Sequence, residues 1–266
     1  MRRLALLLTL LVAGCMADTI LLWPPKRAAT YPQLREMIDN NSIEIFRATS
    51  NPNYEPDAYM LCFFGNGMLA DEPVAQLAFM AQPLRLELWG VNYAGYGGSK
   101  GDASLAGVAR TARRAYTELA KRANGKPIII FGTSLGTTAA LHVAAHERVA
   151  QLILHNPPPL PELILRRHGW WNLFLFAVPI AFDIPDELDS IENAAKVTAP
   201  AVFISSEDDA VVPISYQERI MKAYGGDWEL LVMRGAGHNS PIQDWVIERV
   251  KCVLGAVTTA PACARG

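Results

Sequence analysis

Ser134 lies at the centre of a Gly-x-Ser-x-Gly pentapeptide at residues 132–136. An apolar run at residues 128–131 precedes it, and a helix-forming stretch at residues 137–141 follows it. This order predicts a strand, a sharp turn and a helix, with the serine hydroxyl at the tip of the turn. The hydroxyl is then a candidate nucleophile, and the backbone N–H of Leu135 a candidate donor to a developing oxyanion. Without the flanking strand and helix, the pattern is equally typical of an ordinary turn.

Two further loops could supply the groups that activate such a serine. Asp208 and Asp209 follow an apolar run at residues 201–205, and His238 follows the run at residues 228–233 in a glycine-rich loop. A carboxylate just past a strand end can accept the Nδ1 proton of a histidine, which can then take a proton from serine. The residues alone leave the two aspartates in competition. Carboxylates in a surface loop are usually only solvated, and a lone histidine in a loop commonly has a structural role.

A glycine-rich loop after the apolar run at residues 58–64 could supply a second oxyanion donor. It begins with Gly65, Asn66 and Gly67. Small residues let a backbone N–H turn toward the end of the sheet, where acyl-transfer chemistry requires it. An ordinary strand-to-helix turn has the same composition, so the place of the loop before Ser134 favours the functional interpretation.

The pattern of apolar residues predicts an α/β fold. Continuous apolar runs are typical of buried strands, and apolar residues at every third or fourth position are typical of amphipathic helices. The expected strands cover residues 43–48, 58–64, 84–91, 128–131, 149–155, 201–205 and 228–233. The expected helices cover residues 34–39, 73–82, 104–124, 137–141 and 243–254. Because strand and helix alternate, we expect a mostly parallel sheet with helices on both faces and the candidate loops together at its carboxyl edge.

From about residue 43 to residue 254 the chain resembles the α/β-hydrolase superfamily, and within it the membrane-associated serine hydrolases that include acyl-protein thioesterases and monoacylglycerol lipases. The resemblance rests on the loop at residues 92–99 (Asn-Tyr-Ala-Gly-Tyr-Gly-Gly-Ser), the serine pentapeptide, an Asp-x-x-Val-Pro pattern and a Gly-x-Gly-His pattern. It implies the α/β-hydrolase fold, with Ser134 as the nucleophile and His238 as general base and then acid. It also implies that Asp209, and not its neighbour, orients the histidine.

The same resemblance implies two oxyanion donors and neither a cofactor nor a metal. Leu135 would supply one backbone N–H, and Asn66 or Gly67 the other. The first loop of the family usually reads His-Gly-Asn, whereas Phe64 replaces the histidine here and leaves the backbone donor in place. The sequence contains no CxxC motif or His/Cys cluster that would suggest a metal site.

The first 15 residues are expected to be an export signal outside the fold. Two arginines precede an apolar run at residues 4–13, which is too short to span a bilayer comfortably. Residues 11–15 (Leu-Val-Ala-Gly-Cys) resemble the lipobox of bacterial lipoproteins, so a lipidated Cys15 would anchor the protein to a membrane on the periplasmic side of the cell envelope. A signal peptide that is simply cleaved nearby, or an uncleaved anchor, is the alternative.

The remaining chain divides into a linker and N-terminal segment at residues 16–42, a hydrolase domain at residues 43–258 and a tail at residues 259–266. Within the domain, residues 160–197 interrupt the alternation of strand and helix and are rich in aromatic side chains. We expect a short helical cap there, which either shapes an apolar acyl pocket or only packs on the domain.

Composition and cysteine usage narrow the range of partners. The chain has 266 residues, 51% of them hydrophobic, and a net charge of −2, so it lacks the basic field that would attract nucleic acid. Cys62 lies in an apolar run and is expected to be buried. Cys252 and Cys263 could form a disulfide in an oxidising compartment, and the sequence alone does not decide between the paired and the free state.

The sequence therefore predicts a serine hydrolase that cleaves a carboxylic ester or thioester of a small molecule through an acyl-enzyme intermediate, and acyl and lipid compounds are among the candidate substrates. A serine peptidase of the same fold is one alternative. The other is an envelope lipoprotein that keeps the fold as a binding or assembly module with a vestigial triad. An acyltransferase would need a site for an acceptor other than water, and the sequence offers no sign of one.

Overall fold

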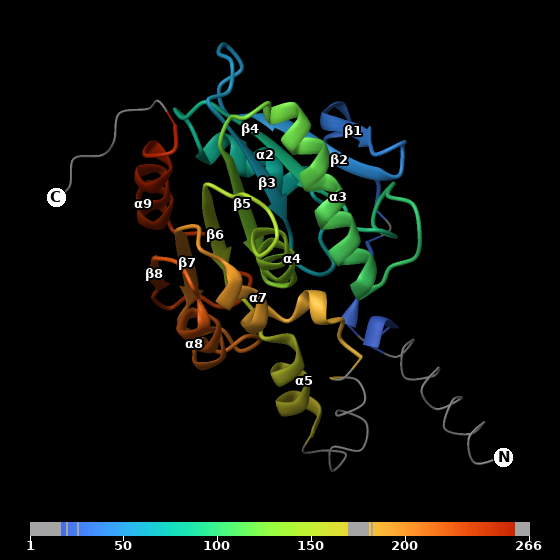
Figure 1. Ribbon diagram of the computed structural model, residues 1–266, viewed down its shortest axis with the longest axis vertical. Helices are drawn as coiled ribbons and strands as arrows, with labels where there is room; N and C mark the ends of the chain where they lie inside the picture. The colour runs from blue at the N-terminus through green and yellow to red at the C-terminus, as the bar shows by residue number, and fades with distance from the viewer. Residues whose placement is uncertain (1–16, 20, 26, 170–180, 182, 259–266) are drawn as a thin grey trace.

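An eight-stranded sheet forms the centre of the protein (Figure 1). The computed structural model describes residues 17–258 except residues 20, 26, 170–180 and 182. The strands at one edge, from β1 to β4, pair antiparallel, and all other neighbours are parallel. In spatial order the strands are β1 (Arg35–Ile38), β2 (Ile43–Thr49), β4 (Leu86–Val91), β3 (Ala58–Phe63), β5 (Ile128–Thr133), β6 (Gln151–His155), β7 (Ala201–Ser206) and β8 (Trp228–Met233).

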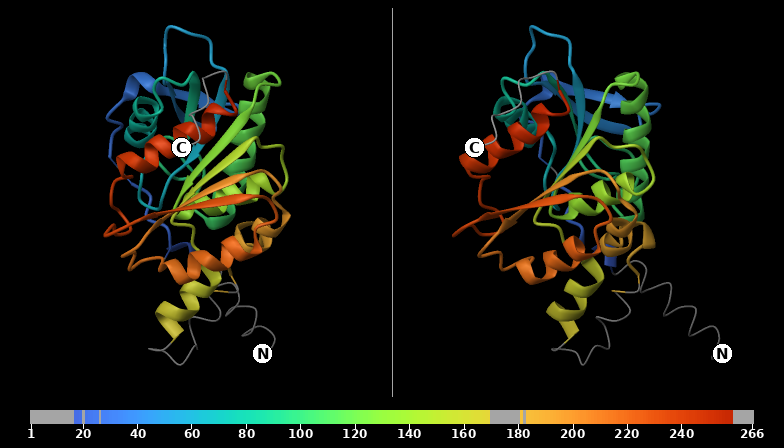
Figure 2. Two further views of the ribbon diagram at one scale, coloured as in Figure 1. Left: turned by 90° about the vertical axis from the view of Figure 1, so that its left-hand side faces the viewer. Right: turned by 60° about the vertical axis from the view of Figure 1, so that its left-hand side comes forward.

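Helices cover both faces of this sheet (Figures 1 and 2). Helices α2 (Asp71–Met80) and α9 (Asp244–Gly255) contribute to the apolar core on one face. The other face is covered by α3 (Leu105–Ala123), α4 (Leu135–Ala144), α7 (Ser190–Lys196) and α8 (Ile214–Ala223). The structure confirms the predicted mostly parallel sheet between two layers of helix.

The continuous apolar runs follow from burial on both sides of the sheet. Along β3, Leu61 and Phe63 belong to the core beneath α3 and α4, whereas Met60 and Cys62 belong to the core beneath α2 and α9. Every residue of β3 is buried, so both sets of alternating positions must be apolar. Cys62 is fully buried and free, as expected, and burial raises the pKa of its thiol.

The expected helix at residues 34–39 is wrong. A short 3₁₀ turn, η1 (Pro32–Leu34), leads into the strand β1, which pairs antiparallel with β2. Asp39, Asn40 and Asn41 all adopt positive φ angles of 50–58°, a region that Asn and Asp tolerate better than most residues. This turn reverses the chain and makes a hairpin, and pairing with β2 decides the conformation of a segment too short to be stable as a helix by itself.

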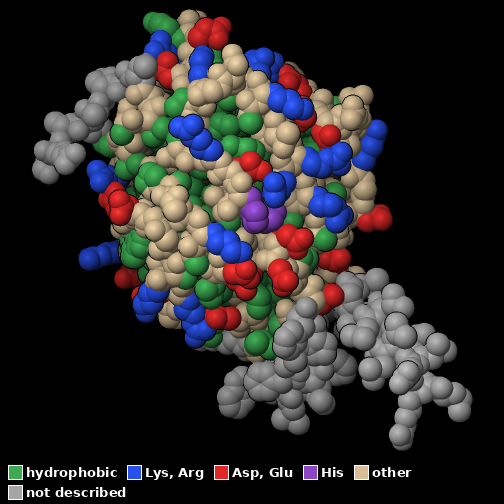
Figure 3. Space-filling view, viewed as in Figure 1, with side chains coloured by type: hydrophobic (Ala, Val, Ile, Leu, Met, Phe, Trp, Pro, Cys, Tyr) green, Lys and Arg blue, Asp and Glu red, His purple; other side chains and the backbone are tan. Residues whose placement is uncertain are grey.

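Charged side chains of both signs are interspersed over the face that carries α3 (Figure 3). Arg113 pairs with Glu147 at 2.8 Å and Arg114 with Asp39 at 2.6 Å. The polar side of α3 is thus a solvated surface on which Arg113 and Arg114 have carboxylate partners.

The expected cap region contains the helix α5 (Leu160–Gly169), which projects from one end of the molecule, the 3₁₀ turn η2 (Asp186–Leu188) and α7 (Figures 1 and 2). Most of its aromatic side chains lie outside the described residues, as do the export signal with Cys15 and the tail. Among the described helices, none is both long and apolar enough to cross a membrane. Cys252 is disulfide-bonded, and its pairing with Cys263 stays a prediction because Cys263 is not described.

Candidate active site

The predicted turn around Ser134 joins the end of β5 directly to the start of α4. Ser134 adopts φ 50° and ψ −124°, a conformation that L-residues rarely take and that costs of the order of 1–3 kcal/mol. Two close approaches require glycine beside it. A Cβ on Gly136 would lie 2.1 Å from the carbonyl oxygen of Phe63, and one on Gly132 would lie 2.8 Å from Cα of Thr137. The sharp turn therefore depends on both glycines.

A chain of hydrogen bonds runs from Ser134 through His238 to Asp209. His238 Nε2 lies 3.0 Å from Ser134 Oγ, and its Nδ1 lies 2.6 Å from Asp209 Oδ2. Asp209 has a fully buried side chain, whose Oδ1 accepts hydrogen bonds from the backbone N–H groups of Val211 and Val212. The structure thus brings together the three residues that the sequence predicted from separate loops at the carboxyl edge of the sheet.

Asn156 holds the histidine loop in place, a role that was not predicted from the sequence. It follows β6 directly and has a φ angle of 50°. Its Nδ2 donates to the backbone oxygen of His238 at 3.3 Å and to Ser206 Oγ at 3.0 Å, while its Oδ1 accepts the Ser206 N–H at 2.8 Å. Its position at a strand end next to β5 was the available signal, because that edge also carries the other site residues.

His155 is a second histidine beside this chain of hydrogen bonds. Its backbone oxygen accepts the N–H of Ser134 at 2.8 Å, which ties the serine turn to β6. Burial, and to a smaller extent the neighbouring His238, lower the pKa of its imidazole to about 4, while Asp209 acts in the opposite direction. His155 is therefore neutral at physiological pH and does not compete with His238 for a proton.

The loop after β3 lies against Ser134, since a Cβ on Gly65 would be 3.5 Å from Cβ of Ser134. The two predicted donors of this loop differ. The N–H of Gly67 interacts with the hydroxyl of Tyr96. In the described part of the chain, the backbone N–H groups of Asn66 and Leu135 have no hydrogen-bond acceptor. Two donors that bind a ligand would be unpaired in this way when no ligand is bound.

The loop at residues 92–99 supports this donor loop. Tyr93 donates its hydroxyl hydrogen to the backbone oxygen of Phe64 at 2.8 Å, and Tyr96 donates to Asn66 Oδ1 at 2.8 Å. Phe64, in the place of the family's histidine, is buried with its ring against Phe131. An apolar contact thus supports the loop at this position.

Glu44 organises the loop at residues 92–99 from the neighbouring strand β2. Its buried carboxylate accepts hydrogen bonds from Asn92 Nδ2 at 2.6 Å and from the Gly98 N–H at 2.7 Å, and it pairs with Arg35. A Cβ on Gly97 would lie 2.3 Å from Glu44 Oε2 and one on Gly98 would lie 2.6 Å from Glu44 Oε1, so the carboxylate explains why these two positions are glycine. The alternating sequence of β2 is typical of a solvent-facing glutamate and concealed this role.

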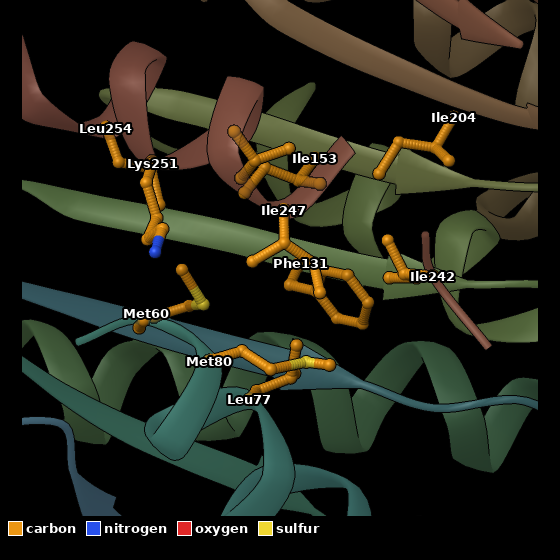
Figure 4. Close-up of a pocket in the computed structure, with 12 residues that line it drawn as sticks. Met60, Leu77, Met80, Phe131, Ile153, Ile204, Ile242, Ile247, Lys251 and Leu254 are labelled. Carbon is orange, nitrogen blue, oxygen red and sulfur yellow. The ribbon is translucent and has the colours of Figure 1, made fainter. Parts of the chain in front are cut away.

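An apolar cavity of about 50 Å³ lies between α2 and α9 on the sheet face opposite α4 (Figure 4). Ile153, Ile204, Phe131, Met80 and Ile242 point into it from the sheet, from α2 and from the loop before α9. Ser134, Asp209 and His238 do not line it. Within the described residues there is also no group of three or more His, Cys, Asp or Glu side chains that could hold a metal ion.

An α/β sheet with a hydrogen-bonded serine, histidine and aspartate at its carboxyl edge is typical of α/β hydrolases. The comparisons with known proteins agree with this class. No family model matches the chain. An uncharacterized protein of Mycobacterium tuberculosis is 32% identical over 188 residues, covering 69% of this chain and 63% of that protein. The α/β hydrolase domain-containing protein aho-3 of Caenorhabditis elegans is 27% identical over 195 residues, covering 69% of this chain and 54% of that protein.

Among solved structures, Est1E from Butyrivibrio proteoclasticus matches with a TM-score of 0.64 and 18% identity, over 84% of this chain and 98% of that one. The chain belongs to the α/β-hydrolase superfamily. It spans 54% to 63% of the length of the two curated relatives named above.

Proposed function

We propose that the protein is a serine hydrolase that cleaves carboxylic ester or thioester bonds. The observation that carries this proposal is the continuous hydrogen-bonded chain from Ser134 Oγ through His238 to the buried Asp209. This geometry lets the histidine take the serine proton, while the carboxylate fixes the Nδ1–H tautomer and stabilises the imidazolium. Membership of the α/β-hydrolase superfamily supports a hydrolytic reaction, although the fold alone specifies no substrate.

In the proposed reaction, Ser134 Oγ attacks the acyl carbonyl carbon as its proton passes to His238 Nε2. The carbonyl oxygen becomes an oxyanion, which the N–H groups of Leu135 and Asn66 would stabilise. Collapse of this intermediate breaks the bond to the leaving alcohol or thiol, which takes the proton from His238. A water molecule then attacks the acyl-enzyme, with His238 again acting as base and then acid, and releases the carboxylic acid.

The decisive experiment uses the purified full chain in detergent and an active-site-directed fluorophosphonate. We expect labelling of the wild type and its loss in Ser134→Ala, together with loss of p-nitrophenyl ester hydrolysis. His238→Gln serves as a second variant, because it keeps the serine and should lose turnover as well. A folded wild-type protein that neither labels nor hydrolyses any ester would contradict the proposal and favour a binding module with a vestigial triad.

Graded substrates distinguish the remaining possibilities. Hydrolysis of p-nitrophenyl esters from two to sixteen carbons would show whether a short or a long acyl chain is preferred, and acyl thioesters would test the second bond type. The cap, with its aromatic side chains, leads us to propose apolar acyl chains. Cleavage of peptide substrates with no turnover of esters or thioesters would instead favour the peptidase alternative.

We also propose that Cys15 is lipidated and anchors the protein to a membrane of the cell envelope. The sequence pattern at residues 11–15 supports this proposal. Incorporation of an alkyne-tagged fatty acid into the wild type, and its loss in Cys15→Ala, would be the expected result. Equal incorporation in both proteins, or none in either, would contradict it.

A further inference from the structure

We propose that the N-terminal segment formed by residues 17–19 and 21–23 is a positioning element of the active site, which holds the carboxamide of Asn66 and so fixes the loop that presents the Asn66 N–H toward Ser134. This inference rests on the proposed serine hydrolase function, because it assigns a role in stabilising the oxyanion. It gives a catalytic effect to a segment that the sequence analysis treated as a linker.

Both polar atoms of the Asn66 carboxamide are hydrogen-bonded to the N-terminal segment. Its Oδ1 accepts the backbone N–H of Trp23 at 2.9 Å and the hydroxyl of Tyr96 at 2.8 Å, while its Nδ2 donates to the backbone oxygen of Leu21. The carbonyl of Leu21 and the N–H of Trp23, two residues apart, thus both bond to the Asn66 side chain. Backbone groups with this spacing bond to a neighbouring strand in the same way. An asparagine side chain has only two rotatable bonds, so fixing its amide restricts the backbone from which it extends.

The segment can act as a support because it is itself fixed in the fold. Ala17 is fully buried and Leu22 is 4% exposed, and both belong to the core that contains Tyr93 and Tyr96. Asp18 Oδ1 accepts the backbone N–H of Leu105 at 2.7 Å, at the first residue of α3. The segment is therefore attached to the start of α3 at one end and to Asn66 at the other.

A part of the expected cap region, at residues 183–184, meets the segment from a third side. Ile184 is buried in the same core as Ala17. Burial raises the pKa of Asp183, and the nearby carboxylate of Asp18 raises it further. The segment thus lies between the donor loop, the start of α3 and residues 183–184 of the cap region. A change in its position would therefore displace the donor loop.

A backbone proline substitution tests the central contact. Trp23→Pro removes the N–H that binds Asn66 Oδ1, and two prolines already follow at residues 24 and 25. Trp23→Ala keeps the N–H and removes only the indole, which is 68% exposed, so it is the reference for the proline variant. Asn66→Ala removes the carboxamide and keeps its own backbone N–H.

An oxyanion donor acts in the transition state, so its displacement lowers kcat and leaves KM nearly unchanged. Loss of one donor costs about 10²–10³ in kcat, and a partial displacement should cost about tenfold. We expect that loss in Trp23→Pro relative to Trp23→Ala, and in Asn66→Ala relative to wild type, for the best p-nitrophenyl ester, with unchanged unfolding temperatures. The double variant should lose no more than either single variant, since both changes break the same connection.

Unchanged kcat in folded Trp23→Pro would overturn the inference, and so would losses that multiply in the double variant. Should Trp23→Pro fail to fold, Asn66→Ala alone decides, because it must lower kcat with unchanged KM and unfolding temperature. Absence of labelling at Ser134 in the wild type would instead refute the proposed function. The two failures are therefore distinguishable.

Discussion

The Nδ1 atom of His238 lies 2.6 Å from Oδ2 of Asp209, and the adjacent Asp208 lies outside this contact. Asp209 is buried, whereas Asp208 is exposed and bonds through its backbone N–H to the oxygen of Ala236 at 2.9 Å. The two aspartates are chemically identical, so the contrast between them isolates the effect of position.

Asp209→Asn should reduce kcat by roughly 10³–10⁴, because the amide favours the wrong tautomer of His238 and cannot stabilise its positive charge. Asp208→Asn is the matched control and should stay within about twofold of wild type, since an exposed carboxylate contributes little. Steady-state hydrolysis of a p-nitrophenyl ester measures both. Equal losses in the two variants would show that the histidine is not oriented by Asp209 alone.

Glu44→Gln should lower the free energy of unfolding by about 2 kcal/mol, because a buried carboxylate that accepts several hydrogen bonds is replaced by an amide that presents a donor to other donors. Glu36→Gln is the control: Glu36 lies on the adjacent strand and also pairs with an arginine, Arg47, but its side chain is 41% exposed. We expect it to cost less than about 1 kcal/mol. Urea unfolding of both variants decides, and similar costs would contradict the role assigned to Glu44.

His142 makes stability depend on pH. It is 5% exposed on α4, and burial lowers the pKa of its imidazole to about 4 from the ordinary 6.5, with His146 and Arg113 acting in the same direction. Below pH 6.5 the imidazole of His142 binds a proton in the unfolded chain, whereas in the folded chain it stays neutral down to about pH 4. The free energy of unfolding therefore falls as the pH falls from 6.5 to 4, by an amount on the order of 3 kcal/mol.

In His142→Leu we therefore expect the unfolding free energy to depend less steeply on pH across this range, with His155 accounting for part of the slope that remains. His146→Leu is the control, because His146 is exposed in the turn that follows α4 and its ring is 4.9 Å from that of His142. Urea unfolding at a series of pH values measures the slope. An unaltered slope in His142→Leu would refute this assignment.

Local patterns in the sequence were sufficient for most elements of the sheet. The run 58–64 predicted β3, and the glycines around Ser134 predicted the turn between β5 and α4, because both depend on residues that are neighbours in the chain. The segment at residues 34–39 was predicted wrongly because its conformation depends on pairing with β2. Propensity in a short segment is weak compared with such a pairing.

The residues of the candidate site also divide into those that local sequence predicted and those that depend on distant contacts. Ser134 and His238 were recognisable from their own loops, but the choice of Asp209 over Asp208 came from the resemblance, and the structure separates the two by burial. The contacts of Glu44, of Asn156 and of the N-terminal segment with Asn66 were not predicted, because the partners are 48, 82 and 43 residues apart in the chain.

The sequence by itself therefore determined the alternation of strands and helices, the serine turn and the types of residue available for chemistry. Periodicity and turn preferences act over a few residues, so they can be read from a single chain. Only the tertiary structure decided which polar groups meet across the sheet edge, because those contacts depend on how distant strands are ordered and which side chains lose their water. The burial of Asp209 and Glu44, and the hydrogen bonds from residues 21 and 23 to Asn66, are features that only the tertiary structure decided.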